Sequence, residues 1–493
     1  MNASQSSESQ RSARRRPNRA RLTTPAARSI VVLTAAALAA ASIPSGAQSQ
    51  SGRGGPPIIR DAEIEQLLRE YTQPILKAAG LSQQNVRVVI INDPSFNAFV
   101  ADGRRIFINS GALMQANTPN EVIGVLAHES GHIAGGHLAR IREQMANAST
   151  ESMVAMLLGI GALVAGARSG TPGAGDIGLA GLSAPQAVLQ NTMLSYIRAQ
   201  EEQADRAGVK FLTATGQSPK GMYDTFKRLG DELLFQSRYI DPYLQTHPMP
   251  KERVAALEEL VKTSPYWDKK DPPELQFRHD MMRAKLYGYM DRSGTTANRY
   301  SPGDQSLPAR YARAIAATRF SDLGSAMSQV DALIAARPQY PYFYEVKGQT
   351  LLEAGKAAEA IAPLRRAAQL APNPALIQIL LGRALVESND PAHLAEAITV
   401  LENSLAREPE SADGYSQLAI AYGRKGDLGH ADLASAQAAL LTGDIKTARM
   451  LAGRAKDRFP VGSPGWVKSD DISNRNKDGA ARTTVVVHPK DPP

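Results

Sequence analysis

A repeat of 34 residues in the C-terminal half of the chain constrains its fold more than any other feature. Pro338 and Pro372 lie 34 positions apart, and so do Gly348 and Gly382. Small residues at fixed positions let two paired helices approach closely, and a proline ends the second helix of each pair. The period therefore predicts an array of helix pairs, each packed on its neighbours. The same spacing, lengthened to 37 in the last unit, recurs at Ala326, Ala360 and Ala397 and at Pro372 and Pro409.

The period and these residue types resemble tetratricopeptide repeats over residues 308–460. Three units are recognisable, and residues 444–459 are expected to form a capping helix. The three additional residues of the last unit fall in Glu387–Pro391, where a turn between helices can absorb them. An ordinary helical bundle is the alternative for this region. The polar residues 461–493 are expected to be a disordered tail.

The first 47 residues predict an export signal. Seven arginines lie between positions 11 and 28, an apolar stretch covers residues 29–41, and Ser45-Gly46-Ala47 offers the small residues of a cleavage site. We therefore expect a cleaved signal peptide over 1–47 and a mature protein in the periplasm. A retained N-terminal membrane anchor is the alternative.

Composition excludes several classes of function. Without residues 1–47, Lys and Arg fall from 56 to 49 and Asp and Glu from 48 to 47, so the formal charge falls from +8 to +2. That balance gives no reason to expect nucleic acid as a partner. The chain has no cysteine, which excludes disulfides, thiol catalysis and cysteine-ligated zinc. Beyond the N-terminal segment, no run of 18 apolar residues predicts a membrane-spanning helix.

The region 58–290 mixes helical and strand periodicity, and a polar, proline-containing linker is expected at 291–307. The pattern predicts a mainly α (α+β) domain with a small β-sheet, ahead of an α-solenoid of repeats. Thr118 is a suitable N-cap for the helix that follows it. The expected elements are a helix around 64–76, strands at 86–91 and 105–108, a helix at 119–142 and a long helix after Leu189.

Residues 153–182 differ from the rest of this region. Met153–Ala165 is a 13-residue apolar run, and Gly and Ala dominate from there to Leu182. The run is too short to span a bilayer, but it suits a buried helix, a lid or contact with a membrane surface. Both a covering lid and membrane-surface contact stay open.

The segment His128-Glu129-Ser130-Gly131-His132 carries the chemistry. Histidines at i and i+4 lie on one helix face, so both imidazoles can reach one metal ion. Glu129 lies between them and can instead take a proton from a water that the ion activates. The segment therefore predicts one catalytic zinc per chain, unless the pattern is a coincidence on the surface.

A catalytic zinc needs a third protein ligand. His137 lies about 140° around a continuing helix from the face of His132, so we reject it as a ligand and expect it behind the site. Glu201 and Asp205 share one face of a second predicted helix. Glu201 can bind the ion, while Asp205 can accept a hydrogen bond from a ligand histidine.

Together these motifs resemble the gluzincin metallopeptidases of the CAAX-prenyl-protease and heat-shock-protease type. Their zincin-type domain would cover residues 58–290. One departure is Gly136, where the family often has Arg directly before the additional histidine. The resemblance rests on H-E-x-x-H, His137, E-x-x-A-D from Glu201 with Ser195 and Arg198 before it, Thr246-His247-Pro248, and Arg253.

The resemblance implies zinc at His128, His132 and Glu201, with Glu129 as the general base. His247 is expected near the metal, either as a fourth ligand that blocks water or as a donor to the oxyanion, unless it is merely a turn residue. The resemblance also implies Asp205, His137 and Arg253 behind the ligands. It implies Asn97, Ala98 and Phe99 beside the substrate. An extended substrate could pair, as an added strand, with the strand expected within residues 99–109.

Two hypotheses follow for function. The first is a periplasmic zinc endopeptidase, also a possible chaperone, that acts on unfolded or misassembled envelope proteins, with its repeats docking on the assembly machinery of outer-membrane proteins. The second is a catalytically silent repeat scaffold or chaperone. Retention of His128, Glu129, His132 and Glu201 favours the first. A peptidoglycan-processing metalloenzyme is a weaker third class, since no recognition motif supports it.

Overall fold

The computed structural model describes residues 57–101, 103–144, 184–235, 243, 247–290 and 294–475 of the 493-residue chain. The expected signal peptide (1–47) and the apolar segment 153–182 lie outside the described residues. No helix within the described ranges combines the length and the apolar character needed to cross a membrane.

Four strands of the described chain form one mixed sheet in the order β1-β2-β4-β3. The central strands β2 and β4 are parallel, in register from Arg87↔Arg105 to Ile91↔Asn109, and confirm the two predicted strands. The antiparallel edge strands β1 and β3 were not predicted, because two or three residues cannot show an alternating pattern. The strands are β1 (Ile58–Ile59), β2 (Arg87–Ile91), β3 (Ala98–Val100) and β4 (Arg105–Asn109).

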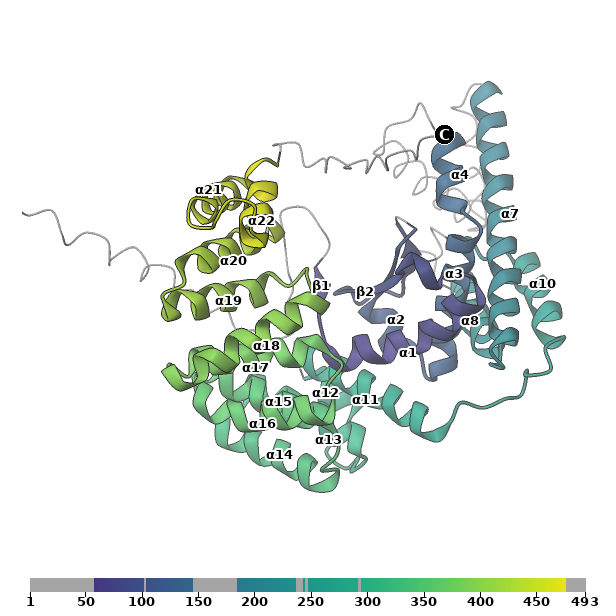
Figure 1. Ribbon diagram of the computed structural model, residues 1–493. Helices are drawn as coiled ribbons and strands as arrows, with labels where there is room; N and C mark the ends of the chain where they lie inside the picture. Colours follow the sequence, from purple (N-terminus) through teal and green to yellow (C-terminus); the bar gives the residue numbers. More distant parts are fainter. Residues whose placement is uncertain are drawn as a thin grey trace, which may run out of the picture. The chain divides into compact units, whose positions relative to one another are not determined.

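Helix α3 (Pro119–Ala134) lies at the centre of the N-terminal part and packs against α1, α7 and α8 (Figure 1). The predicted cap is present, since the Thr118 hydroxyl accepts a hydrogen bond from the Glu121 N–H at 3.3 Å. Every residue from Pro119 to Gly131 is buried. The surrounding helices are α1 (Ala62–Ala78), η1 (Ser82–Gln84), α2 (Ser110–Gln115), α4 (His137–Gln144), α7 (Ala184–Ala214), α8 (Lys220–Phe235), α10 (Lys251–Lys262) and α11 (Pro273–Met290).

The single helix predicted over 119–142 is wrong. Helix α3 ends at Ala134, Gly136 has a φ of +63°, and α4 begins at His137. A positive φ is costly for residues with a Cβ, so glycine permits this break.

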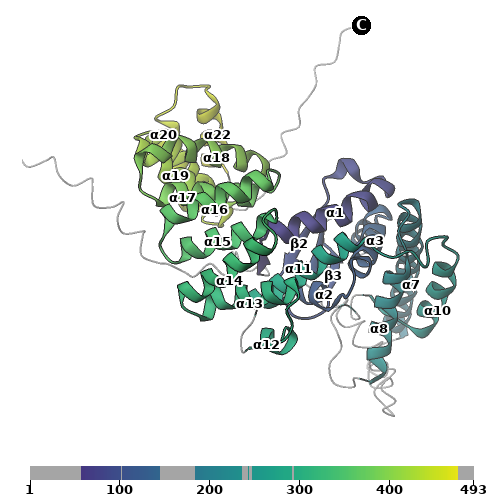
Figure 2. The same ribbon diagram turned by 90° about the horizontal axis from the view of Figure 1, so that it is seen from below.

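Helices α13 to α22 form an array in which each packs on the next one in sequence (Figure 2). The two recurring glycines explain the period: a Cβ at Gly348 would lie 2.3 Å from the Leu364 side chain, and one at Gly382 would lie 2.5 Å from Leu401. Their assignment as tetratricopeptide repeats stays a prediction. The helices are α13 (Leu307–Phe320), α14 (Leu323–Ala336), α15 (Pro341–Glu353), α16 (Ala357–Leu370), α17 (Ala375–Glu387), η2 (Pro391–His393), α18 (Leu394–Arg407), α19 (Ala412–Lys425), α20 (Leu428–Leu441), α21 (Ile445–Lys456) and α22 (Pro464–Ser473).

Two boundaries differ from expectation. Residues 294–306 of the expected linker hold the short helix α12 (Thr295–Arg299), which packs on α11 and α13. The tail expected to be disordered from residue 461 contains α22, whose Ser463 hydroxyl accepts a hydrogen bond from the Trp466 N–H. Helix α22 packs on α20 and α21, and the buried Ile472 joins their small core. An apolar partner therefore outweighs the polar composition of this segment.

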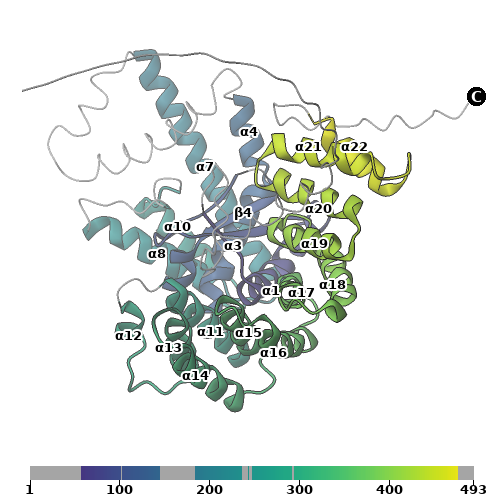
Figure 3. The same ribbon diagram turned by 90° about the vertical axis from the view of Figure 1, so that its left-hand side faces the viewer.

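Helix α11 joins the N-terminal part to the helix array. Met281 and Ala284 belong to the core of the array, whereas Met282 and Leu286 belong to the core of the N-terminal part. Helix α1 also lies beside α17, as Figure 3 shows. The two parts thus share a packed boundary.

Candidate metal centre

The two histidines of α3 point their Nε2 atoms at each other. The distance from His128 Nε2 to His132 Nε2 is 3.1 Å. His128 is fully buried, and the side chain of His132 is 13% exposed. One helical turn separates them, so the site begins with two imidazoles converging on one point.

Helix α7 brings Glu201 to the same point. Its two carboxylate oxygens lie 3.4 Å from His128 Nε2 and 3.4 Å from His132 Nε2. The helices approach this closely because the residues between them are small: a Cβ at Gly131 would lie 2.8 Å from the Ala204 carbonyl oxygen. Ala204 lies three positions after Glu201 on α7 and is fully buried.

His247 closes the cluster from a third segment. Its Nδ1 lies 3.0 Å from a Glu201 oxygen and 3.4 Å from His128 Nε2. Its ring stacks on Tyr243 with centroids 4.5 Å apart. His128, His132, Glu201 and His247 each offer one ligand atom, and these atoms all lie within 4.8 Å of one another. These four residues are called the ligand cluster below.

Behind the ligand cluster, Asp205 and Arg253 hold its charged groups in place. Asp205 Oδ1 lies 3.0 Å from His128 Nδ1. Arg253 donates to both Asp205 oxygens at 2.7 and 2.8 Å and contacts Glu201 at 2.8 Å. A planar guanidinium suits this double contact with carboxylates.

His137 lies behind His132, with its Nδ1 2.9 Å from His132 Nδ1. Its Nε2 lies 3.3 Å from the Gln203 side-chain oxygen. The break at Gly136 turns His137 back toward the site, so the continuous helix used to place it was wrong. Even so, His137 is outside the ligand cluster.

The electrostatics of the cluster favour a positive charge. Burial alone would raise the pKa of Glu201, but His247 and Arg253 hold it well below its ordinary value. Burial lowers the pKa of His128, but Asp205 and Glu201 outweigh this and raise it to about 9. The cluster therefore attracts a cation, for which a proton and a metal ion compete.

The donor set fits a metal ion. Asp205 Oδ1 lies 3.0 Å from His128 Nδ1, and the other ring nitrogen, His128 Nε2, faces His132 Nε2 and Glu201. Two imidazole nitrogens and a charged carboxylate at these separations suit a divalent cation with mixed nitrogen and oxygen ligands.

Glu129 lies against the ligand cluster without a hydrogen bond. Both of its oxygens are buried and have no hydrogen-bond partner among the described residues. His247 Nε2 lies 3.5 Å from one of them. Burial raises the pKa of Glu129. A buried carboxylate with unused lone pairs beside a metal cluster can receive a proton from a reacting group.

Asn97, Ala98 and Phe99 lie at and just before β3, an edge strand of the described sheet that contacts α3. Ala98 is fully buried, and Phe99 stacks on Phe107 with centroids 5.2 Å apart. Asn97 Oδ1 is buried without a hydrogen-bond partner in the described part of the chain. Nothing in this arrangement shows a substrate, so their role stays a prediction.

Sequence reasoning missed the aromatic wall of the site. Phe226 on α8 meets the His128 ring edge-on at 5.1 Å and lies under Arg253 at 5.6 Å. Tyr243 is fully buried, and its carbonyl oxygen accepts from the His247 N–H at 2.7 Å. In the sequence, only the spacing of four between Tyr243 and His247 indicated that an aromatic ring lies beside the site. An isolated aromatic residue such as Phe226 cannot be told from an ordinary residue of the hydrophobic core.

A pair of histidines one turn apart, a glutamate from a second helix and a buried glutamate between the histidines define a metallopeptidase. Residues 59–261 match Peptidase family M48, so this part of the chain is a metallopeptidase domain similar to those of that family. The resemblance stated from the sequence is confirmed.

Relatives extend the similarity beyond this domain. The chain is 26% identical over 423 residues to the beta-barrel assembly-enhancing protease of Yersinia pestis, covering 83% of each chain. It is 25% identical over 420 residues to the protein of that name from Escherichia coli K12, covering 83% of this chain and 82% of the relative. The mitochondrial metalloendopeptidase OMA1 of Schizosaccharomyces pombe is 25% identical over 187 residues, which are 38% of this chain and half of that one.

Proposed function

We propose that this metallopeptidase is a zinc-dependent endopeptidase of the periplasm that acts on misassembled envelope proteins during outer-membrane assembly. The observation that carries the proposal is the convergence of His128, His132 and Glu201 beside the buried Glu129. The relatives from Yersinia pestis and Escherichia coli K12 match more than four fifths of the chain, and their name, beta-barrel assembly-enhancing protease, supports the assembly role.

His128, His132 and Glu201 would hold the zinc ion. When bound, zinc supplies a Lewis acid that polarises the scissile carbonyl and makes a water more acidic. Glu129 takes the proton of the attacking water and later passes it to the leaving amine. Its two oxygens suit this task because no described residue occupies them with a hydrogen bond.

Asp205, Arg253 and His137 act through the ligands. Asp205 fixes the orientation of the His128 ring through Nδ1. Arg253 keeps Asp205 and Glu201 in place and charged. His137 orients His132 from the opposite side of its ring.

His247 acts as a gate in this proposal. Its Nδ1 is 3.0 Å from Glu201 and belongs to the ligand cluster, which supports a fourth ligand that excludes water in a resting state. Donation to the oxyanion is the alternative role, and it would require the ring to turn toward the substrate carbonyl.

An extended substrate would lie along β3, the edge strand next to α3. Added-strand pairing uses backbone hydrogen bonds, so it accepts many sequences, as quality control requires. Asn97, Ala98 and Phe99 would line this path. The helix array would dock on the assembly machinery, and the segment 153–182, outside the described residues, would cover the site or touch the membrane surface.

A catalytically silent scaffold is the competing proposal, and Glu129→Gln separates the two. We expect the variant to keep the wild-type metal content and lose cleavage of unfolded casein. Glu202→Gln is the matched control, because Glu202 lies on α7 beside Glu201 but pairs with Arg206 at an exposed position. Cleavage by Glu129→Gln at the wild-type rate, or a wild-type protein with metal but no activity on any unfolded substrate, would overturn the proposal.

A further inference from the structure

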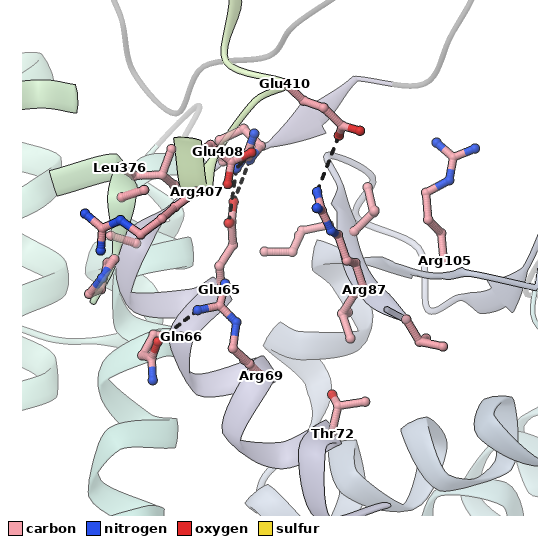
Figure 4. Close-up of a pocket in the computed structure, with 18 of the residues that line it drawn as sticks. Glu65, Gln66, Arg69, Thr72, Arg87, Arg105, Leu376, Arg407, Glu408 and Glu410 are labelled. Atoms are coloured by element: carbon pink, nitrogen blue, oxygen red, sulfur yellow. Dashed lines mark hydrogen bonds and ion pairs between the residues drawn. The ribbon is translucent and has the colours of Figure 1, made fainter. Parts of the chain in front are cut away.

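A cavity of about 720 Å³ lies between the sheet edge and the helix array (Figure 4). Helix α1 and strands β1 and β2 form one wall. The start of α17 and the end of α18 form the other. None of its lining residues belongs to the ligand cluster or touches Glu129 in the described structure. Its size falls within the range of small-ligand and peptide pockets.

The walls are joined by Arg60. Its guanidinium contacts Glu65 on α1 at 2.7 Å and Glu408, just after α18, at 3.0 Å. All three side chains are at most 19% exposed. Arg60 therefore bridges these two carboxylates and neutralises one of their two negative charges, which leaves the whole lining, with six arginines and three glutamates, at a formal +3.

The rest of the lining carries an excess of positive charge. Five further arginines face a single further carboxylate, Glu410, whose contact with Arg87 is 3.7 Å long and exposed. A long, exposed ion pair contributes little and can be exchanged. Figure 4 shows Arg69, Arg87, Arg105 and Arg407 around the cavity. The five are Arg69, Arg87, Arg104, Arg105 and Arg407.

The cavity also contains an open stretch of sheet edge. Strand β1 pairs only with Ile90 and Ile91, so the β2 residues 87–89 have no strand neighbour on that side within the described chain. The Arg87 N–H donates to the Arg104 carbonyl oxygen on the β4 side at 2.9 Å. Because backbone groups alternate along a strand, the N–H and C=O of Val88 point to the cavity side.

Apolar side chains complete the lining. Val86 just before β2, Val88 on β2 and Leu376 on α17 are half-buried and line the cavity. An extended peptide with alternating side chains would place every second residue near these groups and the others near the arginines. Open backbone groups, an apolar wall and an excess of arginine are the three features of a strand-addition site for acidic peptides.

We propose that this cavity binds an extended acidic segment of a partner protein, which continues the line of β1 along β2 and places its carboxylates on Arg69 and Arg87. The cavity is separate from the metal centre. It would therefore hold the acidic segment of a bound partner whether or not the metal centre is cleaving a substrate. The proposal does not depend on zinc or on the proposed substrate.

The test is binding of a fluorescent peptide of alternating Glu and Val to the full mature chain, followed by anisotropy. We expect saturable binding that weakens with salt, and at least tenfold weaker binding to the double variant Arg69→Gln/Arg87→Gln. Arg206→Gln/Lys262→Gln is the matched control, because both residues form exposed helical pairs outside the cavity. An unchanged midpoint of urea denaturation in both variants would show that each is folded.

Two further probes settle the mode of binding. A peptide with Lys in place of Glu should not bind, and a peptide with Pro in place of alternate Val should bind at least tenfold more weakly, since Pro cannot pair as a strand. Equal binding of the Pro peptide, unchanged affinity of the Arg69/Arg87 variant, or binding of inorganic polyphosphate without any binding of the acidic peptide would each overturn the proposal.

Discussion

Two clusters of buried charged side chains in the described part of the molecule stabilise their charges in different ways. In the ligand cluster, His128, His132 and His247 surround the charged Glu201. In the second, called the Lys285 cluster, the ammonium of Lys285 on α11 is surrounded by carboxylates from α1, α15 and the N-cap of α1. Its Nζ lies 2.8 Å from Asp61, 3.4 Å from Glu63 and 3.1 Å from Glu345.

The Lys285 cluster supplies its own cation and its own protons. Burial raises the pKa of Glu63, and it raises that of Glu345 to about 7. Tyr311 donates to Glu63 at 2.9 Å, and Tyr340 donates to it as well. The carboxylate oxygens of the Lys285 cluster therefore face cations and hydrogen-bond donors that the chain itself supplies.

The ligand cluster leaves its lone pairs facing one another. Two imidazole nitrogens stand 3.1 Å apart next to a carboxylate whose pKa is held low. Such an arrangement is stabilised by an added divalent cation. The difference teaches that a buried charged cluster marks a metal site where ligand atoms of several side chains face one another, as His128 Nε2 and His132 Nε2 do, and not where donors of the chain already face every carboxylate.

The largest expected effect is the loss of metal from the ligand cluster. Glu201→Ala should lose nearly all bound metal and all casein cleavage, because two histidines alone hold zinc poorly. Metal content by mass spectrometry checks this, with Glu202→Ala as the control on the same helix. A full complement of metal in Glu201→Ala would mean that the third ligand lies elsewhere.

Removing the cation of the second cluster should act on stability instead. Lys285→Met leaves the buried Glu63 and Glu345 and the partly buried Asp61 without the Lys285 ammonium, and we expect a loss of about 3–5 kcal/mol in the free energy of unfolding. Urea denaturation measures this. Metal content per folded chain should stay at the wild-type level. A variant as stable as wild type would show that these carboxylates are protonated and need no cation.

A smaller effect is expected behind the ligands. Asp205→Asn keeps a similar shape but loses the charge that orients His128, so zinc affinity should fall by roughly 10–100-fold. Competition with a chromogenic chelator measures the affinity. A loss as complete as that of Glu201→Ala would make Asp205 a direct ligand, which its contact with Nδ1 of His128 and with Arg253 argues against.

The smallest effect is expected for His247 in its proposed role as a fourth ligand. If it closes the cluster as a fourth ligand, His247→Ala should raise basal casein cleavage several-fold at unchanged metal stoichiometry. If it stabilises the oxyanion, the same change should lower the rate by about 10²–10³-fold. Initial rates at saturating zinc distinguish the two, and an unchanged rate would leave His247 with the structural contact to Tyr243 alone.

Features with a local period were predictable from the sequence. The H-E-x-x-H helix needs only the spacing of His128 and His132, and the helix array needs only the recurrence of Gly348 and Gly382, which meet Leu364 and Leu401 in equivalent ways. The two central strands were also clear from their apolar residues. Glu201 was found from its spacing of four to Asp205 on a second predicted helix, and the family resemblance supplied Arg253.

Features built from distant segments could not be predicted. The Lys285 cluster combines α1, α11 and α15, and each of its residues alone looks like an ordinary surface charge. The break at Gly135–Gly136 was missed because glycine is also tolerated within helices. Helix α22 was missed because its composition is polar, and the cavity beside β2 depends on how α17 and α18 meet the sheet.

The most direct test of the central claim, that the ligand cluster is a zinc site, is anomalous X-ray scattering from crystals of the purified protein, measured on both sides of the zinc absorption edge. One peak per chain is expected, about 2.0–2.2 Å from His128 Nε2, His132 Nε2 and a Glu201 oxygen. The absence of a peak there after addition of zinc, or a peak held by other residues, would contradict the account.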